Sequence, residues 1–268
     1  MKQFHKTYSA TAFLLGMLLL FTNISCGSNN KPKNIVVGDA IRFLRREAPF
    51  HLEGFGMVRN IGYEGNYVLF KMQIYEDDTY GLNVNKISSK QTVAKKIVSA
   101  QIGMMNKQMK DAMMNIAEQS YGLRIVMNGS NSNQGIINLS PDEIKTALSN
   151  TPNKTPEDFS LEMLALSIKL ILPAQVDQRT TWTDTRMTDT SFEYIYIIND
   201  ENINLDAVDL SVLKKEKITT LRRQNTDSMR KVVNLCKSTH RNLVIRFIGY
   251  HSNKKIDIVL TPSDLEKI

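Results

Sequence analysis

Apolar and polar positions follow two different spacings along this chain, and the order of these spacings occurs twice. Residues 67–75 and 192–198 are rich in aromatic and β-branched side chains and lead into acidic turns, which is typical of β-strands. Each is followed by a long stretch, residues 92–119 and 208–239, in which apolar residues recur at helical spacing. Each half therefore predicts a helix, two strands, one long helix, two strands and a short helix.

The strongest similarity between the halves lies in their last pair of predicted strands. The matched pairs are Gly129 and Gly249, Ser132 and Ser252, Asn133 and Asn253, and Pro141 and Pro262. In each half an alternating strand enters a Gly/Ser/Asn turn and a second strand leaves it, as expected for a β-hairpin. Ser140 or Thr261 then stands before a proline and an acidic residue, which favours the start of a helix.

We therefore predict an α+β fold of two tandem repeats, residues 38–149 and 156–268. In each repeat, a four-stranded antiparallel sheet is expected to be covered on one face by one long helix. Residues 150–156 are composed of Asn, Thr, Pro and Lys and form the natural linker between the repeats.

Residues 1–25 have the pattern of a secretory signal. A basic start precedes a short apolar stretch at residues 13–21, and the small residue Ser25 stands directly before Cys26. This arrangement resembles the lipobox of bacterial lipoproteins, which implies that the Cys26 thiol carries a lipid in the mature protein. An ordinary signal peptide or an uncleaved anchor is the alternative. Residues 26–37 are expected to form a flexible tether.

The chain has a formal net charge of +7, from 34 Lys and Arg against 27 Asp and Glu. Removal of Lys2 and Lys6 with the signal leaves 32 basic and 27 acidic residues, a net charge of +5. An exported protein meets little nucleic acid. We therefore expect its partners to be the membrane, through the lipid anchor, and an anionic envelope glycolipid or an acidic protein. The oligomeric state does not follow from the sequence.

The chain contains only two cysteines. If Cys26 carries the lipid, Cys236 has no partner and no disulfide forms. Cys236 shares the predicted apolar helix face with Leu221, Met229 and Val232. We therefore expect the Cys236 thiol to be buried and unpaired.

Two short motifs give the chain a resemblance to two-repeat envelope lipoproteins of Gram-negative bacteria. Pro173-Ala-Gln-Val176-Asp177 precedes a Thr-rich strand in the second repeat, and Pro49-Phe-His-Leu52-Glu53 is a divergent version in the first. The resemblance implies a lipid-anchored protein of the cell envelope and carries over no catalytic residues. Residues 27–31 contain no acid, which favours the periplasmic side of the outer membrane over the cell surface.

No catalytic or metal-binding motif stands out in the sequence. The three histidines after the signal show no ligand spacing with a second His or Cys, and neither a nucleophile elbow nor a phosphate-binding loop is present. We expect no cofactor and no metal site. The residues that a hydrolase site between the repeats could use are His51, Glu53, His251 and Asp257.

Five methionines crowd the first long helical stretch: Met104, Met105, Met109, Met113 and Met114. Thioethers are soft ligands that suit Cu(I) in exported proteins, and methionines also line adaptable apolar grooves. On a helix with 100° per residue, Met104, Met105 and Met109 fall on the apolar face. Core packing is therefore the interpretation that the sequence favours.

The second long helical stretch carries much of the positive charge. Residues 211–241 hold nine Lys or Arg against two acids, and the spacing aligns four cations on one face: Arg223, Arg230, Lys237 and Arg241. A solvated helix face is the simpler interpretation, and a docking face for anionic head groups or an acidic partner is the candidate function. The sequence thus predicts a lipid-anchored envelope protein that is a non-catalytic binding or scaffolding module, with an envelope hydrolase as the alternative.

Overall fold

The computed structural model describes residues 32, 34–52, 55–76, 83–129, 133–149, 154–224 and 226–268. Residues 34–268 form one compact unit. The predicted signal at residues 1–25 and the lipidation site Cys26 lie outside the described residues. No helix within the described ranges is both long enough and apolar enough to cross a bilayer.

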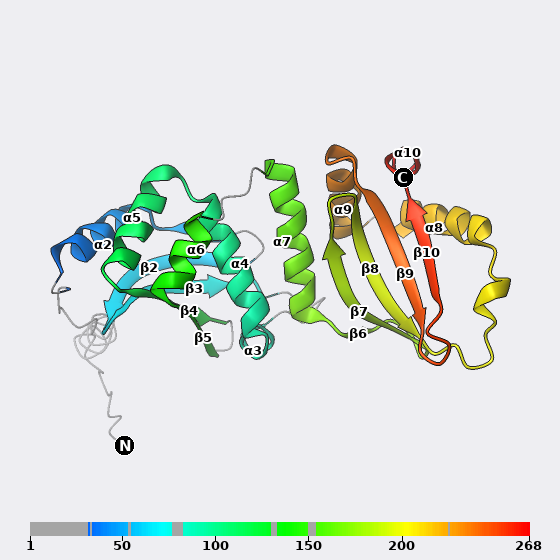
Figure 1. The fold of residues 1–268 in the computed structure, drawn as a ribbon, viewed down its shortest axis with the longest axis horizontal. Helices are drawn as coiled ribbons and strands as arrows, with labels where there is room; N and C mark the ends of the chain where they lie inside the picture. Colours follow the sequence, from blue (N-terminus) through cyan, green and yellow to red (C-terminus); the bar gives the residue numbers. More distant parts are fainter. Residues whose placement is uncertain are drawn as a thin grey trace, which may run out of the picture. The chain divides into compact units, whose positions relative to one another are not determined.

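The chain repeats one order of elements (Figure 1). The first copy, residues 35–149, comprises α2 (Ile35–Glu47), β1 (Phe50–Leu52), β2 (Gly56–Glu64), β3 (Tyr67–Ile74), α3 (Val84–Ser89), α4 (Gln91–Met104), α5 (Lys107–Glu118), β4 (Gly122–Asn128), β5 (Gln134–Leu139) and α6 (Pro141–Ser149). The second copy, residues 156–268, comprises α7 (Pro156–Ile171), β6 (Ala174–Gln175), β7 (Thr180–Met187), β8 (Ser191–Ile198), the 3-10 helix η1 (Leu205–Ala207), α8 (Leu210–Gln224), α9 (Asp227–Ser238), β9 (Asn242–Gly249), β10 (Lys255–Leu260) and α10 (Pro262–Leu265).

The α+β class is as predicted, but the predicted sheet is wrong in two respects. Each sheet has five strands, in the order β1-β2-β3-β4-β5 and its counterpart β6-β7-β8-β9-β10. The fifth strand is the short edge strand, β1 or β6, which is too brief to show a period in the sequence. The central pairs β3–β4 and β8–β9 are parallel, and the other pairs are antiparallel. A helical crossover returns the chain to the start of the preceding strand, so the next strand must run parallel to it.

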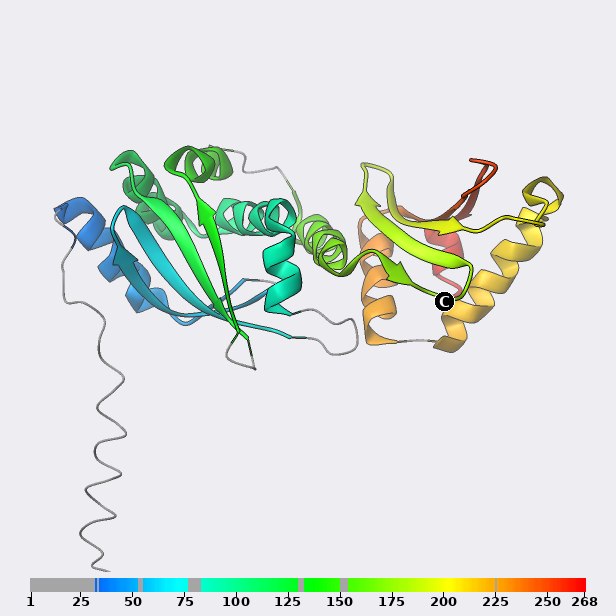
Figure 2. The ribbon, with the colours of Figure 1, turned by 90° about the horizontal axis from the view of Figure 1, so that it is seen from below.

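The first sheet buries one face only. Its central strand β3 alternates between buried and accessible positions, and the buried residues are Val68, Phe70, Met72 and Ile74. Helices α2, α4, α5 and α6 pack on the sheet's buried face (Figure 2). This alternation is the period-2 pattern from which the strand was predicted.

The two copies agree in irregular details as well as in element order. The register of β2 against β3 shifts after Val58, and that of β7 against β8 shifts after Trp182. Trp182 lies 124 positions after Val58, and Ser191, the first residue of β8, lies 124 positions after Tyr67, the first residue of β3. Strands β3 and β8 therefore occupy equivalent places, as the duplication requires.

The prediction of one long helix per copy is wrong, because both helices are broken. Asn106 caps α5 and accepts a hydrogen bond from the Met109 amide at 2.9 Å, and Thr226 caps α9 in the same way from the Met229 amide at 3.4 Å. Both caps have extended backbone, with ψ of 163° and 152°. The apolar spacing continues across each break, so the helical period hid a capping signal that was present in the sequence.

The short closing helices are capped as predicted. In each copy, an ion pair also joins the acid of the cap to one of the helices that connect the third and fourth strands. In α6 the Ser140 hydroxyl and the Glu143 carboxylate bond each other's backbone amides, and in α10 Thr261 and Asp264 do the same. Lys95 of α4 pairs with Glu143 at 2.8 Å. Lys214 of α8 makes the matching 2.6 Å pair with Asp264, which holds the pKa of that carboxyl well below its usual range.

A buried acid explains one of the paired glycines. Asp200 follows β8, is 6% exposed, and accepts the amide N–H groups of His251 at 2.8 Å and Ser252 at 3.2 Å. Hydrogen bonds from the Ser252 hydroxyl and the His251 amide lower the Asp200 pKa to about 2. A side chain at Gly249 would collide with the Asp200 carboxylate, and one at Gly129 would collide with that of Glu76. Each hairpin thus has a glycine at the point approached by an acid that follows the neighbouring strand, β3 or β8.

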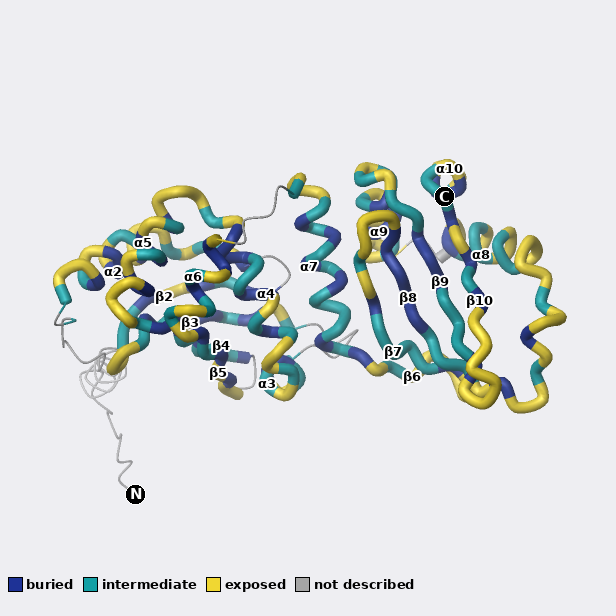
Figure 3. Tube along the Cα trace, viewed as in Figure 1, coloured by how far each residue is buried: buried dark blue, intermediate teal, exposed yellow. Residues whose placement is uncertain are grey.

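Helix α7 belongs to both hydrophobic cores. Phe159, Met163 and Leu170 pack in the core of the first copy, whereas Leu161 and Ala165 pack in that of the second. None of residues 158–171 is exposed, as Figure 3 shows along the helix.

A lysine of the first copy caps the end of this helix. The Lys90 ammonium donates hydrogen bonds to the carbonyl oxygens of Lys169, at 2.8 Å, and Leu172. Burial lowers the pKa of Lys90. A cation at a helix C-terminus satisfies free carbonyls and interacts favourably with the helix dipole. This contact ties the first copy to the opening helix of the second.

The predicted tether extends too far. The sequence predicts it over residues 26–37, but α2 begins at Ile35. The Asn34 side chain accepts hydrogen bonds from the amides of Val36 and Val37, which is the capping geometry that favours a helix start.

Cys236 is buried and unpaired, as predicted. It is 0% exposed on the apolar face of α9, and burial raises its pKa to about 12. We expect a thiol reagent to leave native Cys236 unmodified and to react after denaturation, because the thiolate is the reactive form. Labelling followed by mass analysis checks this. Rapid labelling of the folded protein would contradict the packing of α9.

We expect Gly249→Ala to destabilise the protein by about 2 kcal/mol, because the added methyl group displaces the Asp200 carboxylate from the hairpin. Chemical denaturation measures the effect. Gly62→Ala is the matched control, since its nearest contact would be the Leu69 Cβ at 4.0 Å, and it should change stability by less than about 0.5 kcal/mol. Equal effects of the two substitutions would refute the role of Asp200.

Candidate binding pocket

The break between α4 and α5 creates a corner of methionine side chains. Met104 is the last residue of α4, Met105 is its extended C-cap, and Met109 lies in the first turn of α5. The sequence placed these three residues on one face of an unbroken helix. The Asn106 cap instead turns the chain, so the three side chains gather around the corner.

These methionines line a pocket of about 540 Å³ that we call the methionine pocket. Its lining residues are Phe50, His51, Leu52, Tyr75, Gln101, Met104, Met105, Met109 and Phe159. They come from the edge strand β1, the end of β3, the α4–α5 corner and the first turn of α7. Its volume lies in the range of small-molecule sites, and its walls are mostly apolar, as in such sites.

The pocket has a buried floor and an accessible wall. Leu52, Phe159 and Met109 are 3%, 7% and 8% exposed, whereas Met104 is 36% exposed. Phe50 is fixed by an edge-to-face contact with the core residue Phe70, with ring centroids 5.7 Å apart. The pocket thus combines one accessible methionine with buried apolar residues.

His51 and Tyr75 form the polar rim of the methionine pocket. Their rings stack with centroids 6.0 Å apart, and the His51 Nδ1 and the Tyr75 hydroxyl share a hydrogen bond. Sequence reasoning singled out His51 but missed Tyr75, Phe50, Leu52, Gln101 and Phe159. Their positions in the sequence are far apart, and no local motif joins them.

The four residues considered for a hydrolase are not gathered by the described part of the chain. His51 lies at the methionine pocket, and Glu53 lies outside the described residues. His251 is exposed in the β9–β10 turn of the second copy. Asp257 is held in an ion pair on β10.

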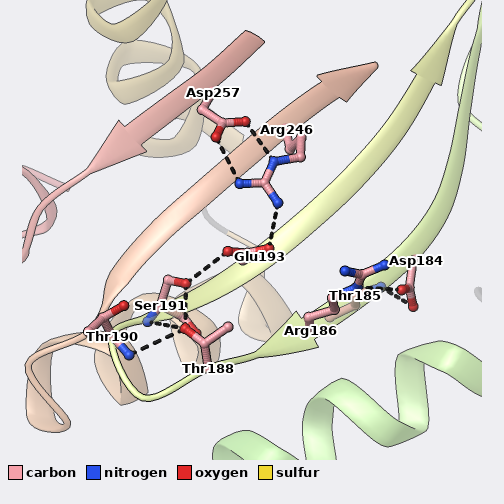
Figure 4. Close-up of polar contacts among 9 residues, drawn as sticks. All are labelled: Asp184, Thr185, Arg186, Thr188, Thr190, Ser191, Glu193, Arg246 and Asp257. Carbon is pink, nitrogen blue, oxygen red and sulfur yellow. Dashed lines mark hydrogen bonds and ion pairs between the residues drawn. The ribbon is translucent and has the colours of Figure 1, made fainter. Parts of the chain in front are cut away.

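That ion pair is part of a network across three strands of the second sheet (Figure 4). Arg246 donates two hydrogen bonds to Asp257, both at 2.8 Å, and a third to Glu193 at 3.0 Å. The Ser191 hydroxyl donates to the other oxygen of Glu193 at 3.1 Å. These bonds, first of all those to Asp257, raise the pKa of Arg246. The bidentate geometry gives Asp257 a structural role.

The four cations of the predicted basic face do not share one helix. Arg223 is exposed on α8, Arg230 pairs with Asp227 on α9, and Arg241 follows the end of α9. Lys237 pairs with Glu266 at 3.6 Å. The predicted face required one helix, but Arg223 lies on α8 whereas Arg230 and Lys237 lie on α9.

Arg241 is the most strongly engaged of these cations. It pairs with Asp158 of α7, and its Nε donates to the carbonyl of Thr188 at 2.9 Å. Its side chain is 12% exposed. Arg241 therefore joins α7 to the β7–β8 turn, and its charge faces a carboxylate.

A second pocket of about 510 Å³ lies beside α7 and β7. Its cations each pair with a carboxylate: Lys154 with Glu162, Lys169 and Arg186 with Asp184, and Arg241 with Asp158. The Thr185 hydroxyl in its wall is buried and has no hydrogen-bond partner. Among the described residues, no group of three or more His, Cys, Asp and Glu is placed to hold a metal ion. This second pocket therefore offers less to a ligand than the methionine pocket.

Comparisons with family models, curated proteins and solved structures gave no match to this chain. We therefore compare the pocket residues of the first copy with the residues at equivalent positions in the second copy. At the positions equivalent to His51 and Tyr75 it has Gln175 and Asn199, 124 residues later. The fold-determining caps and glycines agree between the copies, whereas these rim residues differ.

We expect Arg246→Met to destabilise the protein by about 3 kcal/mol, because it leaves the Glu193 carboxylate, 11% exposed, without its counter-charge. Urea denaturation measures the change. Arg230→Met is the control, because Arg230 is 56% exposed in a surface pair, and it should cost less than about 1 kcal/mol. A network with no structural role would make the two variants equally stable.

Proposed function

We propose that this chain is a non-catalytic binding module of the cell envelope, and that it binds its ligand in the methionine pocket. One observation carries this proposal. Phe50, Leu52, Met109 and Phe159 form an apolar floor that is reached beside the accessible side chain of Met104. Binding sites for small ligands combine such apolar walls with a few polar groups, here His51 and Tyr75.

The differences between the two copies support the same proposal. The helix break is common to both copies, so the fold needs the corner. The methionines that surround the corner are not required by the fold, because residues 224 and 225 of the second copy are Gln and Asn at the equivalent places. Met104 and Met105 are thus specific to the first copy, although Met105 also packs against its core.

The hydrolase alternative receives less support from the described residues. His51 bonds Tyr75, and Asp257 bonds Arg246. A general base needs to be within reach of the proton that it abstracts and of its own orienting group. His51 and Asp257 have separate partners in separate copies, which favours binding over hydrolysis.

The proposed location is the outer membrane, with the protein facing the periplasm. The support is the signal pattern before Cys26, together with the acid-free residues 27–31. Docking of the lysines and arginines on an anionic glycolipid or an acidic protein stays a prediction. Its support is the net charge of +5 after removal of the signal. A single helix face that carries all four predicted cations no longer supports it.

We expect the neutral, apolar fluorescent probe N-phenyl-1-naphthylamine to bind the folded protein, and Met104→Lys to weaken its affinity about tenfold, because a charge would enter the apolar wall. A fluorescence titration measures both. Ile136→Lys is the matched control, since Ile136 is 47% exposed and outside the pocket, and it should bind as the wild type does. Equal affinity of the two variants would refute the methionine pocket as the site.

We expect metabolic labelling with a fatty-acid analogue to mark the wild-type protein and to spare Cys26→Ser, because the lipid attaches to that thiol. Cys236→Ser provides the control for the other cysteine and should be labelled as the wild type is. Labelling that survives in Cys26→Ser would remove the lipid anchor from the proposal.

A further inference from the structure

Three methionines line the methionine pocket. Met104, Met105 and Met109 all line the pocket, and they come from the end of α4, its C-cap and the first turn of α5. Met113, one turn further along α5, is 0% exposed in the core and does not line the pocket. The corner therefore brings one accessible methionine, Met104, to the same pocket as Met105 and Met109, which also pack in the core.

Thioether sulfur atoms bind only a small range of metal ions. A thioether is neutral, polarisable and soft, and it binds Cu(I) in preference to hard divalent ions such as Mg²⁺ or Ca²⁺. Among the described residues that line this pocket, none carries a carboxylate that would attract a hard cation. The pocket therefore selects for a soft monovalent ion.

The second copy shows that the fold does not require these sulfur atoms. Residues 120 positions after Met104 and Met105 are Gln224 and Asn225, whose amide groups are hard ligands. Only Met109 has a methionine counterpart, Met229, and both donate their amides to the helix cap. Met109 is thus common to the two corners, and the other two thioethers are specific to the first.

We infer that the methionine pocket binds one Cu(I) ion through the thioether sulfur atoms of Met104, Met105 and Met109, an inference that rests on this pocket being the binding site. The ion arrives and stays in the Cu(I) state, so binding transfers no electron. Each methionine side chain has three rotatable bonds, which helps the sulfur atoms to converge on one ion.

The test is an anaerobic titration of Cu(I) into the full chain carrying Cys26→Ser, in competition with the chromogenic chelator bathocuproine disulfonate. Cys236, the remaining thiol, is fully buried. We expect one Cu(I) per chain. Met104→Leu with Met109→Leu should weaken binding by about 100-fold or more, because two of three ligands are lost at nearly constant side-chain volume.

The matched control is Met113→Leu with Met114→Leu, on the same helix but outside the pocket lining, and it should bind Cu(I) as the parent chain does. Failure of the parent chain to hold Cu(I) against the chelator, or equal binding by the Met104→Leu/Met109→Leu variant, would overturn the inference. The apolar probe separates this failure from failure of the proposed function. Leucines keep the wall apolar, so probe binding should persist in that variant even if Cu(I) binding is lost.

Discussion

Each sheet depends on a helical crossover between its third and fourth strands. The fourth strand starts beside the first residue of the third, as the register of Tyr67 against Gly122 and of Ser191 against Asn242 shows. The chain must therefore travel back over the sheet before it can pair. A straight helix over residues 92–119 would be about 42 Å long, whereas the eight-residue strand β3 spans about 26 Å. One helix would overhang the sheet, and two shorter helices joined at a cap cover it.

The methionine pocket is a consequence of that break. Capping at Asn106 ends one helix and starts the next, so side chains at the junction point around a corner. Strand β1 and the first turn of α7 close the other sides. The second copy has the same break at Thr226 but different side chains around it. The corner belongs to the fold, and the apolar and thioether lining is specific to the first copy.

The two copies are stabilised differently around the shared helix α7. The core of the first copy has many fully buried aliphatic residues, whereas that of the second is smaller and relies more on aromatic pairs. Trp182, Tyr196 and Phe247 stack across three neighbouring strands, with centroids 6.0 Å and 5.3 Å apart. Cross-strand aromatic pairs stabilise a sheet where burial is incomplete. Burial still raises the Tyr196 pKa to about 12.

Local chemistry in the sequence determined much of this protein. Alternating strands, the caps at Ser140 and Thr261, and the buried face that holds Cys236 all follow from short-range periods and capping rules, which act within a few residues. Tertiary structure decided the parallel central pairs, the division of the long helices, the separation of Arg223 from Arg230 and Lys237, and the meeting of His51 with Tyr75 and the methionines. These features depend on where the crossover returns the chain and on how far a helix can extend over a short sheet. No local pattern of residues encodes those distances.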